Sequence, residues 1–189
     1  MQYHPHTVQA RASTALGPVR LAASPAGLCG VWFEGQRHEP ASFLHGGHAW
    51  AEAAGHPVLQ AAASQLQQYL RGERQAFDLP LDLSGGTPFQ QAVWRALLAI
   101  GRGGTTSYGR LSQQLGRPLA VRAVGAAVGR NPLSVVVPCH RVLGADGSLT
   151  GYAGGLDRKT ALLTMENALF APPRPPVPAG ALPPEKGHE

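Results

Sequence analysis

A cysteine and a histidine stand side by side in the second half of the chain, in the run Pro138-Cys139-His140. The thiolate of cysteine, not the thiol, is the nucleophile, so an adjacent imidazole supplies the base that such a sulfur needs. No other histidine lies between His56 and His188. Proline has no N–H to donate to a sheet, so we expect a preceding strand to end at Pro138 and to leave Cys139 at an element boundary. This arrangement predicts an activated sulfur nucleophile at Cys139.

The charged residues that flank this pair in the sequence are all basic. The net charge of the chain is +5, and no acidic residue occurs between Asp82 and Asp146. The basic residues of that interval are all arginines: Arg95, Arg102, Arg110, Arg117, Arg122, Arg130 and Arg141. Arginine suits phosphate contact and stacking better than lysine. A GC-rich genome also favours arginine over lysine, but it does not explain the missing acidic residues, so the interval points to nucleic-acid binding.

The composition limits the classes of protein to consider. A chain of 189 residues with 43% hydrophobic and 14% charged residues has the material for one medium domain or two small ones, and it is not a disordered chain. No apolar run is long enough for a membrane span, and residues 1–5 lack the basic and apolar segments of a secretory signal, so we expect a cytoplasmic protein. Without export, Cys29 and Cys139 are expected to be reduced.

The pattern before the cysteine predicts a small α/β domain over residues 1–85. Short β-prone runs separated by Gly and Pro predict a three-stranded antiparallel meander over 8–12, 19–23 and 28–33. Residues 34–55 are expected to be irregular. Helical spacing of apolar residues predicts a helix over 57–71, and alternation predicts another strand over 77–83.

Residues 86–171 are predicted to form a mostly helical domain that presents the cysteine. Thr87-Pro88 starts a first helix that ends near Gly101. Ser107 caps a short helix over 108–115, and a second helix over 119–128 completes a helix-turn-helix. An apolar strand over 133–137, a Gly-rich loop over 144–155 and a helix over 157–170 follow. The fold class is therefore α/β (α+β), and the Pro-rich residues 172–189 are expected to form a disordered or extended tail.

The second helix of the predicted helix-turn-helix has almost no long polar side chains for reading base edges. It is slim, with Arg122 near its start and Arg130 at its end. Such a helix suits the narrow minor groove better than the hydrogen-bond code of the major groove.

Several motifs in the same order resemble those of the O6-alkylguanine-DNA alkyltransferase family, of the bacterial methylated-DNA–protein-cysteine methyltransferase kind. They are Arg-Ala-Val-Gly at 122–125, Asn-Pro at 131–132, Pro-Cys-His-Arg-Val at 138–142 and Tyr-Ala-Gly-Gly at 152–155. The resemblance is strong over 87–167 and looser but colinear before. It implies a repair protein that moves an alkyl group from O6 of guanine in double-stranded DNA onto its own cysteine, once per molecule. We expect a monomer that needs no cofactor and no membrane, and O4-alkylthymine is a possible second substrate.

Carried over residue by residue, the resemblance implies the catalytic roles. Cys139 is the acceptor, His140 is the base that draws its proton through a water, and Glu166 orients His140. Asn131 holds the turn between the recognition helix and the active-site strand. Tyr108 helps to rotate the nucleotide.

The resemblance also implies a DNA surface and a substrate pocket. Arg122 fills the gap that the rotated nucleotide leaves in the duplex. The other DNA-contact candidates are Tyr108, Ala123, Gly125, Arg130 and Arg141. The pocket candidates are Val142, Tyr152, Ala153, Gly154 and Lys159.

The physical chemistry of the reaction agrees with these roles. The alkyl carbon lies on a guanine edge inside a stacked duplex, so the nucleotide must be extruded before a cysteine reaches it. An arginine from a slim helix can stack into the gap, and a tyrosine at a helix N-terminus can press on the phosphate. The departing guanine needs a hydrogen-bond donor. The Tyr108 hydroxyl and the backbone N–H groups of Val142 and the Gly-rich loop are both open for that role.

Other interpretations stay open at this point. The cysteine and histidines of the first half, Cys29, His4, His6, His38, His45 and His48, fit no standard zinc spacing, so no metal is expected. Ala153 stands where some relatives have a serine. A non-catalytic module that recognises alkylated DNA is one alternative function, although such relatives lack the acceptor cysteine. A cysteine hydrolase is another, although hydrolases usually take their histidine from a distant part of the chain.

Overall fold

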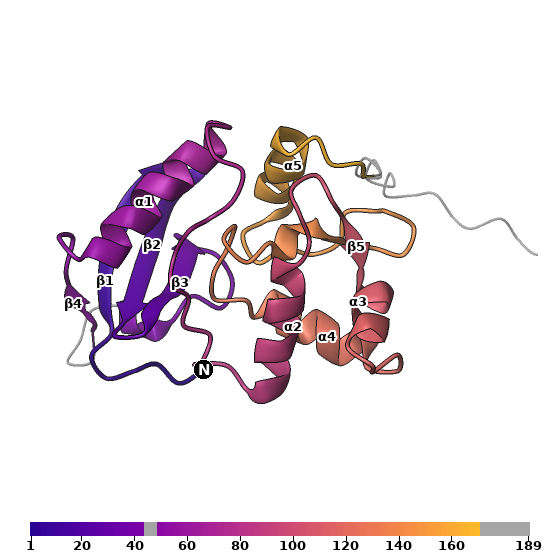
Figure 1. The fold of residues 1–189 in the computed structure, drawn as a ribbon, viewed down its shortest axis with the longest axis horizontal. Helices are drawn as coiled ribbons and strands as arrows, with labels where there is room; N and C mark the ends of the chain where they lie inside the picture. Colours follow the sequence, from indigo (N-terminus) through magenta and orange to yellow (C-terminus); the bar gives the residue numbers. More distant parts are fainter. Residues whose placement is uncertain (44–48, 171–189) are drawn as a thin grey trace, which may run out of the picture.

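The computed structural model describes residues 1–43 and 49–170. Figure 1 shows a sheet covered by one long helix beside a group of shorter helices and loops. The Pro-rich tail expected at 172–189 lies outside the described residues. Among the described residues, no helix has the length and apolarity to cross a membrane.

The predicted antiparallel meander is confirmed. It consists of β1 (Val8–Thr14), β2 (Gly17–Ser24) and β3 (Gly27–Phe33). A short strand, β4 (Ala51–Glu52), pairs parallel with β1, so the sheet order is β3-β2-β1-β4. β4 and the 3-10 helix η1 (Ala41–Phe43) lie within residues 34–55, which were expected to be irregular throughout.

The predicted helix over 57–71 is also confirmed, as α1 (Pro57–Leu70). Its buried residues are Leu59, Ala62, Leu66 and Tyr69, whose spacing of three and four places them on one face. That face packs on the meander. Tyr69 is the last buried residue of this helix.

The predicted strand over 77–83 is wrong. This segment makes a single bridge to β3, between Leu28 and Leu81. The two hydrogen bonds run from Leu28 N to Pro80 O, at 2.7 Å, and from Asp82 N to Leu28 O, at 2.8 Å. Pro80 has no N–H with which to extend a ladder. The alternation in this segment instead reflects alternate burial, because Phe77, Leu79 and Leu81 pack half-buried against the core.

The helical part begins with α2 (Pro88–Leu98), as predicted from Thr87-Pro88. Thr87 and Gln90 form a reciprocal capping box at its start. The indole Nε1 of Trp94 donates to Ala127 O at 2.9 Å and so ties α2 to α4.

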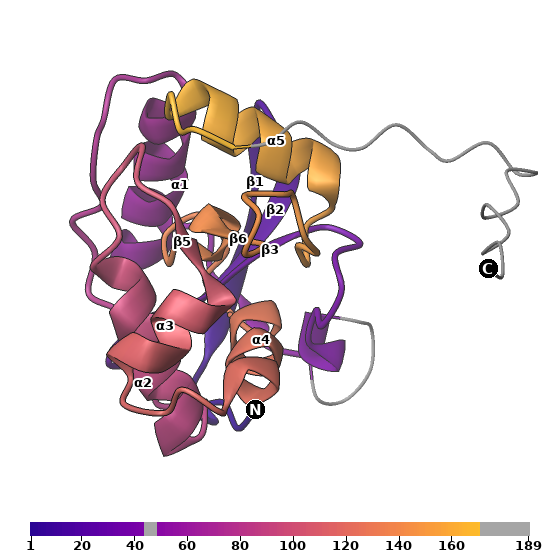
Figure 2. The same ribbon diagram turned by 90° about the vertical axis from the view of Figure 1, so that its right-hand side faces the viewer.

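The predicted helix-turn-helix pair is present as α3 (Tyr108–Gln114) and α4 (Val121–Gly129). Figure 2 shows the two helices beside each other. The Ser107 side chain accepts a hydrogen bond from Arg110 N and caps α3, as predicted. The second helix begins two residues later than predicted, because Arg117 to Ala120 form a turn closed by a bond from Ala120 N to Arg117 O.

The predicted strand over 133–137 is wrong, and a compact buried turn takes its place. One parallel bridge, from Val31 to Leu133, docks it on β3. Val137 N then bonds Leu133 O at 2.8 Å, and Val135 has a φ of 72°. Every residue from 131 to 143 is buried. The apolar run therefore reflects burial on all sides, not pairing in a sheet.

After this turn the chain forms the 3-10 helix η2 (Cys139–Arg141) and then β6 (Val142–Leu143). β6 pairs parallel with β5 (Thr106–Ser107). The last helix, α5 (Leu156–Met165), is shorter than predicted, because Asn167 adopts a φ of 55° that a helix cannot continue through. Figure 2 shows α5 lying across the top of the molecule.

One hydrophobic core runs through both halves of the chain. It contains Val31 and Phe33 from β3 together with Val135, Val137 and Cys139 from the second half. The domain boundary expected at residues 85–86 stays a prediction.

Candidate active site and DNA-binding surface

The sulfur of Cys139 lies inside the turn that Asn131 organises. Cys139 is 6% exposed, and Asn131 Nδ2 lies 3.0 Å from its Sγ. The same amide nitrogen donates to Val137 O at 2.8 Å, and Asn131 Oδ1 accepts from Leu133 N at 3.0 Å. The side chain of Asn131 thus fixes the turn and also directs a donor at the sulfur.

The electrostatic surroundings of Cys139 act in opposite directions. Burial raises the pKa of the Cys139 thiol, while the Asn131 amide and the Lys159 ammonium act to lower it. Burial is the larger influence. The thiol therefore keeps its proton, and a nucleophilic role for this sulfur would require a base to accept that proton.

His140 is fully buried next to Cys139, with its two ring nitrogens in different surroundings. Nε2 lies 2.8 Å from Glu166 Oε1, whereas the buried Nδ1 has no hydrogen-bond partner among the described residues. An ionised carboxylate only accepts hydrogen bonds, so Nε2 carries the hydrogen and Nδ1 keeps a free lone pair. Burial lowers the pKa of His140 and Glu166 opposes it. A neutral imidazole with Nδ1 free is the form that acts as a base.

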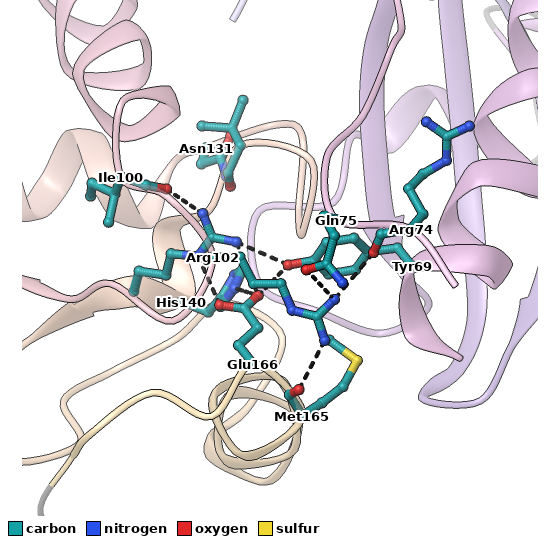
Figure 3. A network of polar contacts seen from close by, with 11 residues as sticks. Tyr69, Arg74, Gln75, Ile100, Arg102, Asn131, His140, Met165 and Glu166 are labelled. Atoms are coloured by element: carbon teal, nitrogen blue, oxygen red, sulfur yellow. Dashed lines mark hydrogen bonds and ion pairs between the residues drawn. The ribbon is translucent and has the colours of Figure 1, made fainter. Parts of the chain in front are cut away.

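Glu166 is the centre of a buried polar network (Figure 3). Its Oε1 accepts from the Tyr69 hydroxyl at 2.5 Å as well as from His140, and its Oε2 accepts from Arg141 Nε at 2.8 Å. Burial alone raises the pKa of Glu166, but hydrogen bonds from His140, Arg141 and Tyr69 outweigh it and hold that pKa well below its ordinary value. The carboxylate is therefore ionised at neutral pH.

Arg141, which the resemblance placed among the DNA contacts, is buried in this structure. Arg141 is 7% exposed, and its guanidinium is fully engaged inside the protein. It donates to both oxygens of Glu166, to the Tyr69 hydroxyl at 2.9 Å and to the carbonyl of Ile100. Arg141 serves as the counter-charge of Glu166.

Two of the predicted pocket residues, Tyr152 and Gly154, contact each other, and the Tyr152 ring lies beside His140. The Tyr152 ring stands edge-on to the His140 ring, with centroids 6.5 Å apart at 82°, and its buried hydroxyl has no partner among the described residues. A methyl group on Gly154 would come within 2.7 Å of the Tyr152 ring, so glycine is required for this close approach. Ala153 is half-buried, and its carbonyl accepts from Arg37 N at 3.1 Å.

Lys159 is buried and holds the pocket loop in place. Its Nζ donates to Val142 O at 2.6 Å and to Thr150 O at 3.0 Å. Burial lowers the pKa of Lys159 to about 8, so it carries most of its charge at neutral pH. Lys159 connects α5, the loop and β6 instead of extending into solvent.

The candidate DNA contacts cluster on α3 and α4. Tyr108 begins α3, and its hydroxyl accepts from Thr150 Oγ1 in the pocket loop at 3.3 Å. A Cβ placed on Gly125 of α4 would lie 3.7 Å from the Tyr108 ring. Arg122, Ala123 and Arg130 are exposed on α4 and at its end. Tyr108 therefore lies between Gly125 of α4 and Thr150 of the Gly-rich loop. Arg122 is exposed on α4.

Sequence analysis missed one residue of the network, Tyr69. It lies within the helix predicted over 57–71, and no spacing links it to Glu166, which lies 97 residues away. A tyrosine on a buried helix face was the available signal, because a buried hydroxyl usually has a hydrogen-bond partner.

Within residues 1–43 and 49–170, no group of three or more His, Cys, Asp or Glu side chains is arranged to hold a metal ion. His45 and His48 lie outside the described residues.

Comparison with known proteins gives matches along most of the chain. Residues 8–83 match the ribonuclease-like domain of 6-O-methylguanine DNA methyltransferase, and residues 88–168 match its DNA binding domain. A methylated-DNA–protein-cysteine methyltransferase of Mycobacterium tuberculosis is 47% identical over 153 residues, which cover 81% of this chain and 88% of that protein. One of Mycobacterium leprae is 46% identical, covering 80% and 87%.

Solved structures agree with these matches. The crystal structure of Mycobacterium tuberculosis OGT in complex with DNA superimposes with a TM-score of 0.74 at 44% identity, covering 86% of this chain and 92% of that one. The O6-methylguanine-DNA methyltransferase of the archaeon Pyrococcus kodakaraensis has a TM-score of 0.60 at 24% identity, covering 86% and 99%, and shows a likeness of fold alone.

Proposed function

The chain belongs to the 6-O-methylguanine DNA methyltransferase family, and on that premise we propose that Cys139 is the residue that accepts the alkyl group. The protein is a DNA-repair methyltransferase of the methylated-DNA–protein-cysteine kind, and it binds DNA. The observation that carries the proposal is a buried cluster in which Asn131 contacts the sulfur of Cys139 and the adjacent His140 contacts Glu166. The other cysteine, Cys29, interacts with the Thr7 side chain and with the charge of Asp82 instead.

The proposed reaction is a displacement at the alkyl carbon. A bond forms between Cys139 Sγ and the carbon as the bond from that carbon to O6 of guanine breaks. The thiol proton moves to the free Nδ1 of His140 and is passed on from there to the departing guanine, so His140 returns to its neutral form and Cys139 ends as a neutral thioether. The Asn131 amide at 3.0 Å stabilises the negative charge that develops on the sulfur. The thioether is stable, so each molecule reacts once.

The proposed substrate is O6-alkylguanine in double-stranded DNA, extruded through the minor groove. Tyr108 lies between the exposed face of α4 and the pocket loop, where it can press on the backbone of a rotating nucleotide. Arg122 is exposed on a helix of small residues and can stack into the vacated position. The monomeric state and the cytoplasmic location expected from the sequence stay predictions.

The test is the intact mass of the protein after incubation with a duplex that carries one O6-methylguanine, followed by peptide mapping. We expect a gain of one methyl group on the peptide that holds Cys139, and no gain in the Cys139→Ser variant. Cys29 provides an internal control, because burial raises the pKa of that thiol to about 12, so it should stay unmodified and Cys29→Ala should keep full transfer.

The alternatives give different results in the same experiment. A non-catalytic recognition module would bind the alkylated duplex without any gain in mass. A cysteine hydrolase would ignore DNA and cleave an ester. Transfer in Cys139→Ser would show that another residue is the acceptor.

A further inference from the structure

The sheet-bearing half of the chain contributes a side chain to the buried acid–base network. Tyr69, the penultimate residue of α1, donates to Glu166 Oε1 at 2.5 Å. The same oxygen lies 2.8 Å from His140 Nε2. A hydroxyl from the first half of the chain therefore shares a carboxylate oxygen with the imidazole next to Cys139 (Figure 3).

The direction of the Tyr69 hydrogen bond follows from the chemistry of its neighbours. Arg141 lies 2.9 Å from the Tyr69 oxygen, and a guanidinium can only donate. The hydroxyl hydrogen must then point to Glu166. Burial and the neighbouring Glu166 raise the pKa of Tyr69, so the hydroxyl keeps its hydrogen throughout the range in which the protein works.

The Tyr69 ring is held by groups that do not touch the carboxylate. It packs against Phe77, with ring centroids 4.8 Å apart, and Arg102 lies 5.4 Å from its centroid. Arg102 in turn donates to Met165 O at 2.9 Å and to the side chain of Gln75 at 3.0 Å, and so joins the two halves of the chain. These contacts fix the place where the hydroxyl meets Glu166.

We propose that Tyr69 is a positioning residue for alkyl transfer, which holds Glu166 so that the hydrogen of His140 stays on Nε2 and Nδ1 stays free for the proton of Cys139. This inference rests on the proposed function of Cys139 and His140. It gives the sheet-bearing half of the chain a part in the chemistry in addition to its part in the core.

Removing the Tyr69 hydroxyl should change the basicity of His140. Tyr69 disperses part of the negative charge of Glu166, and without it that charge acts more strongly on His140. The titratable or charged groups around the His140–Glu166 pair are Tyr69 from α1, Arg102 before β5, Cys139 and Arg141 from η2, Tyr152 from the loop and Lys159 from α5. Tyr69→Phe leaves the others in place. His140 should then hold a proton to higher pH, where it no longer acts as a base.

The experiment measures the single-turnover transfer rate across pH for the full chain and for Tyr69→Phe. We expect a rate about tenfold lower at neutral pH, with the acid limb of the rate profile displaced to higher pH. Affinity for the duplex should be unchanged, and attack on free O6-benzylguanine should fall by the same factor, because the defect lies in the base and not in DNA binding.

Gln75→Ala is the matched control. It removes the side-chain hydrogen bond from Arg102 and so loosens the same interface, while Arg102, Tyr69 and Glu166 all stay in place. It should lower the stability of the protein and leave the pH profile in place. If Tyr69→Phe keeps the wild-type profile, or only lowers stability as Gln75→Ala does, Tyr69 is a packing residue and the inference fails. If the wild-type protein transfers no methyl group to Cys139, the proposed function itself fails.

Discussion

Glu166 is the acceptor shared by the buried polar groups around His140. One carboxylate accepts hydrogen bonds from an imidazole, a guanidinium and a phenol, and all of these groups are buried. Removing one partner of a buried ion pair costs more than the pair itself contributes, because the remaining charge is left without a counter-charge. The ionised state of Glu166 is therefore part of the stability of the fold as well as of the chemistry.

Glu166→Gln should reveal this dependence as a change in stability with pH. The pKa of Glu166 is lowered in the folded protein and returns to its ordinary value of 4.5 on unfolding. The ionised carboxylate thus stabilises the fold above about pH 4.5, and that contribution is lost as the pH falls further, since the unfolded chain then binds a proton that the folded chain does not. Glu166→Gln should lower the free energy of unfolding by about 3 kcal/mol at pH 7.

The measurement is urea unfolding at pH 7 and at several values below pH 4.5. The difference between wild type and Glu166→Gln should shrink as the pH falls. Parallel curves over the whole range would show that Glu166 is not ionised in the fold.

At the scale of the elements, the active-site turn is the part that sequence patterns described least well. Helix starts were predictable, because Thr87 and Ser107 cap α2 and α3 through local hydrogen bonds that their own side chains make. The strand predicted over 133–137 was not, because an apolar run reports burial and does not say which backbone groups pair. In this turn the side chain of Asn131 makes hydrogen bonds with backbone groups of Leu133 and Val137, which in a strand would pair with a neighbouring strand.

Asn131→Ala should therefore disrupt both the turn and the sulfur site. It leaves the buried Leu133 N–H and Val137 carbonyl without their side-chain partner, which should lower the free energy of unfolding by about 3 kcal/mol. It also removes the donor to Cys139 Sγ, so transfer should slow beyond what unfolding explains.

Asn131→Asp separates the two effects. The carboxylate keeps the acceptor for Leu133 N but has no donor for Val137 O or Cys139 Sγ, and its negative charge opposes a thiolate. Its transfer rate, measured under conditions where the protein stays folded, should fall below that of Asn131→Ala. A rate equal to wild type would contradict the role of the amide donor at the sulfur.

For the whole molecule, the two halves of the chain share a core and a buried polar network. The motifs from Arg122 to Gly155 led to the proposed acceptor, the proposed base and most of the proposed pocket, because those residues lie within one short stretch. The contact of Tyr69 with Glu166 joins positions 97 residues apart, and no local pattern records such a pairing. The sequence also showed seven arginines in the acid-free interval, but not which of them face solvent.

Some of these arginines are buried in the structure and others are exposed to solvent. Arg141 is buried against Glu166, and Arg102 bridges the two halves of the chain. The exposed members are Arg95, Arg110, Arg117, Arg122 and Arg130. Each phosphate contact contributes about −0.9 to the slope of the logarithm of the DNA-binding constant against the logarithm of salt concentration, so contacts from the four exposed arginines other than Arg122 would give about −3.6.

The slope should distinguish an arginine that contacts phosphate from an arginine that stacks between bases. Arg130→Ala, at the end of α4, should reduce the magnitude of the slope by about 1 if it neutralises a phosphate. Arg122→Ala should change the slope little, since its proposed role is to stack in the gap of the duplex, but it should weaken repair of duplex DNA more than attack on free O6-benzylguanine. Binding of a labelled duplex at several salt concentrations, with transfer rates on both substrates, checks both variants. An Arg122→Ala protein with equal losses on duplex and free base would place Arg122 outside the extrusion step, and a flat salt response of the wild type would contradict phosphate contacts from this surface.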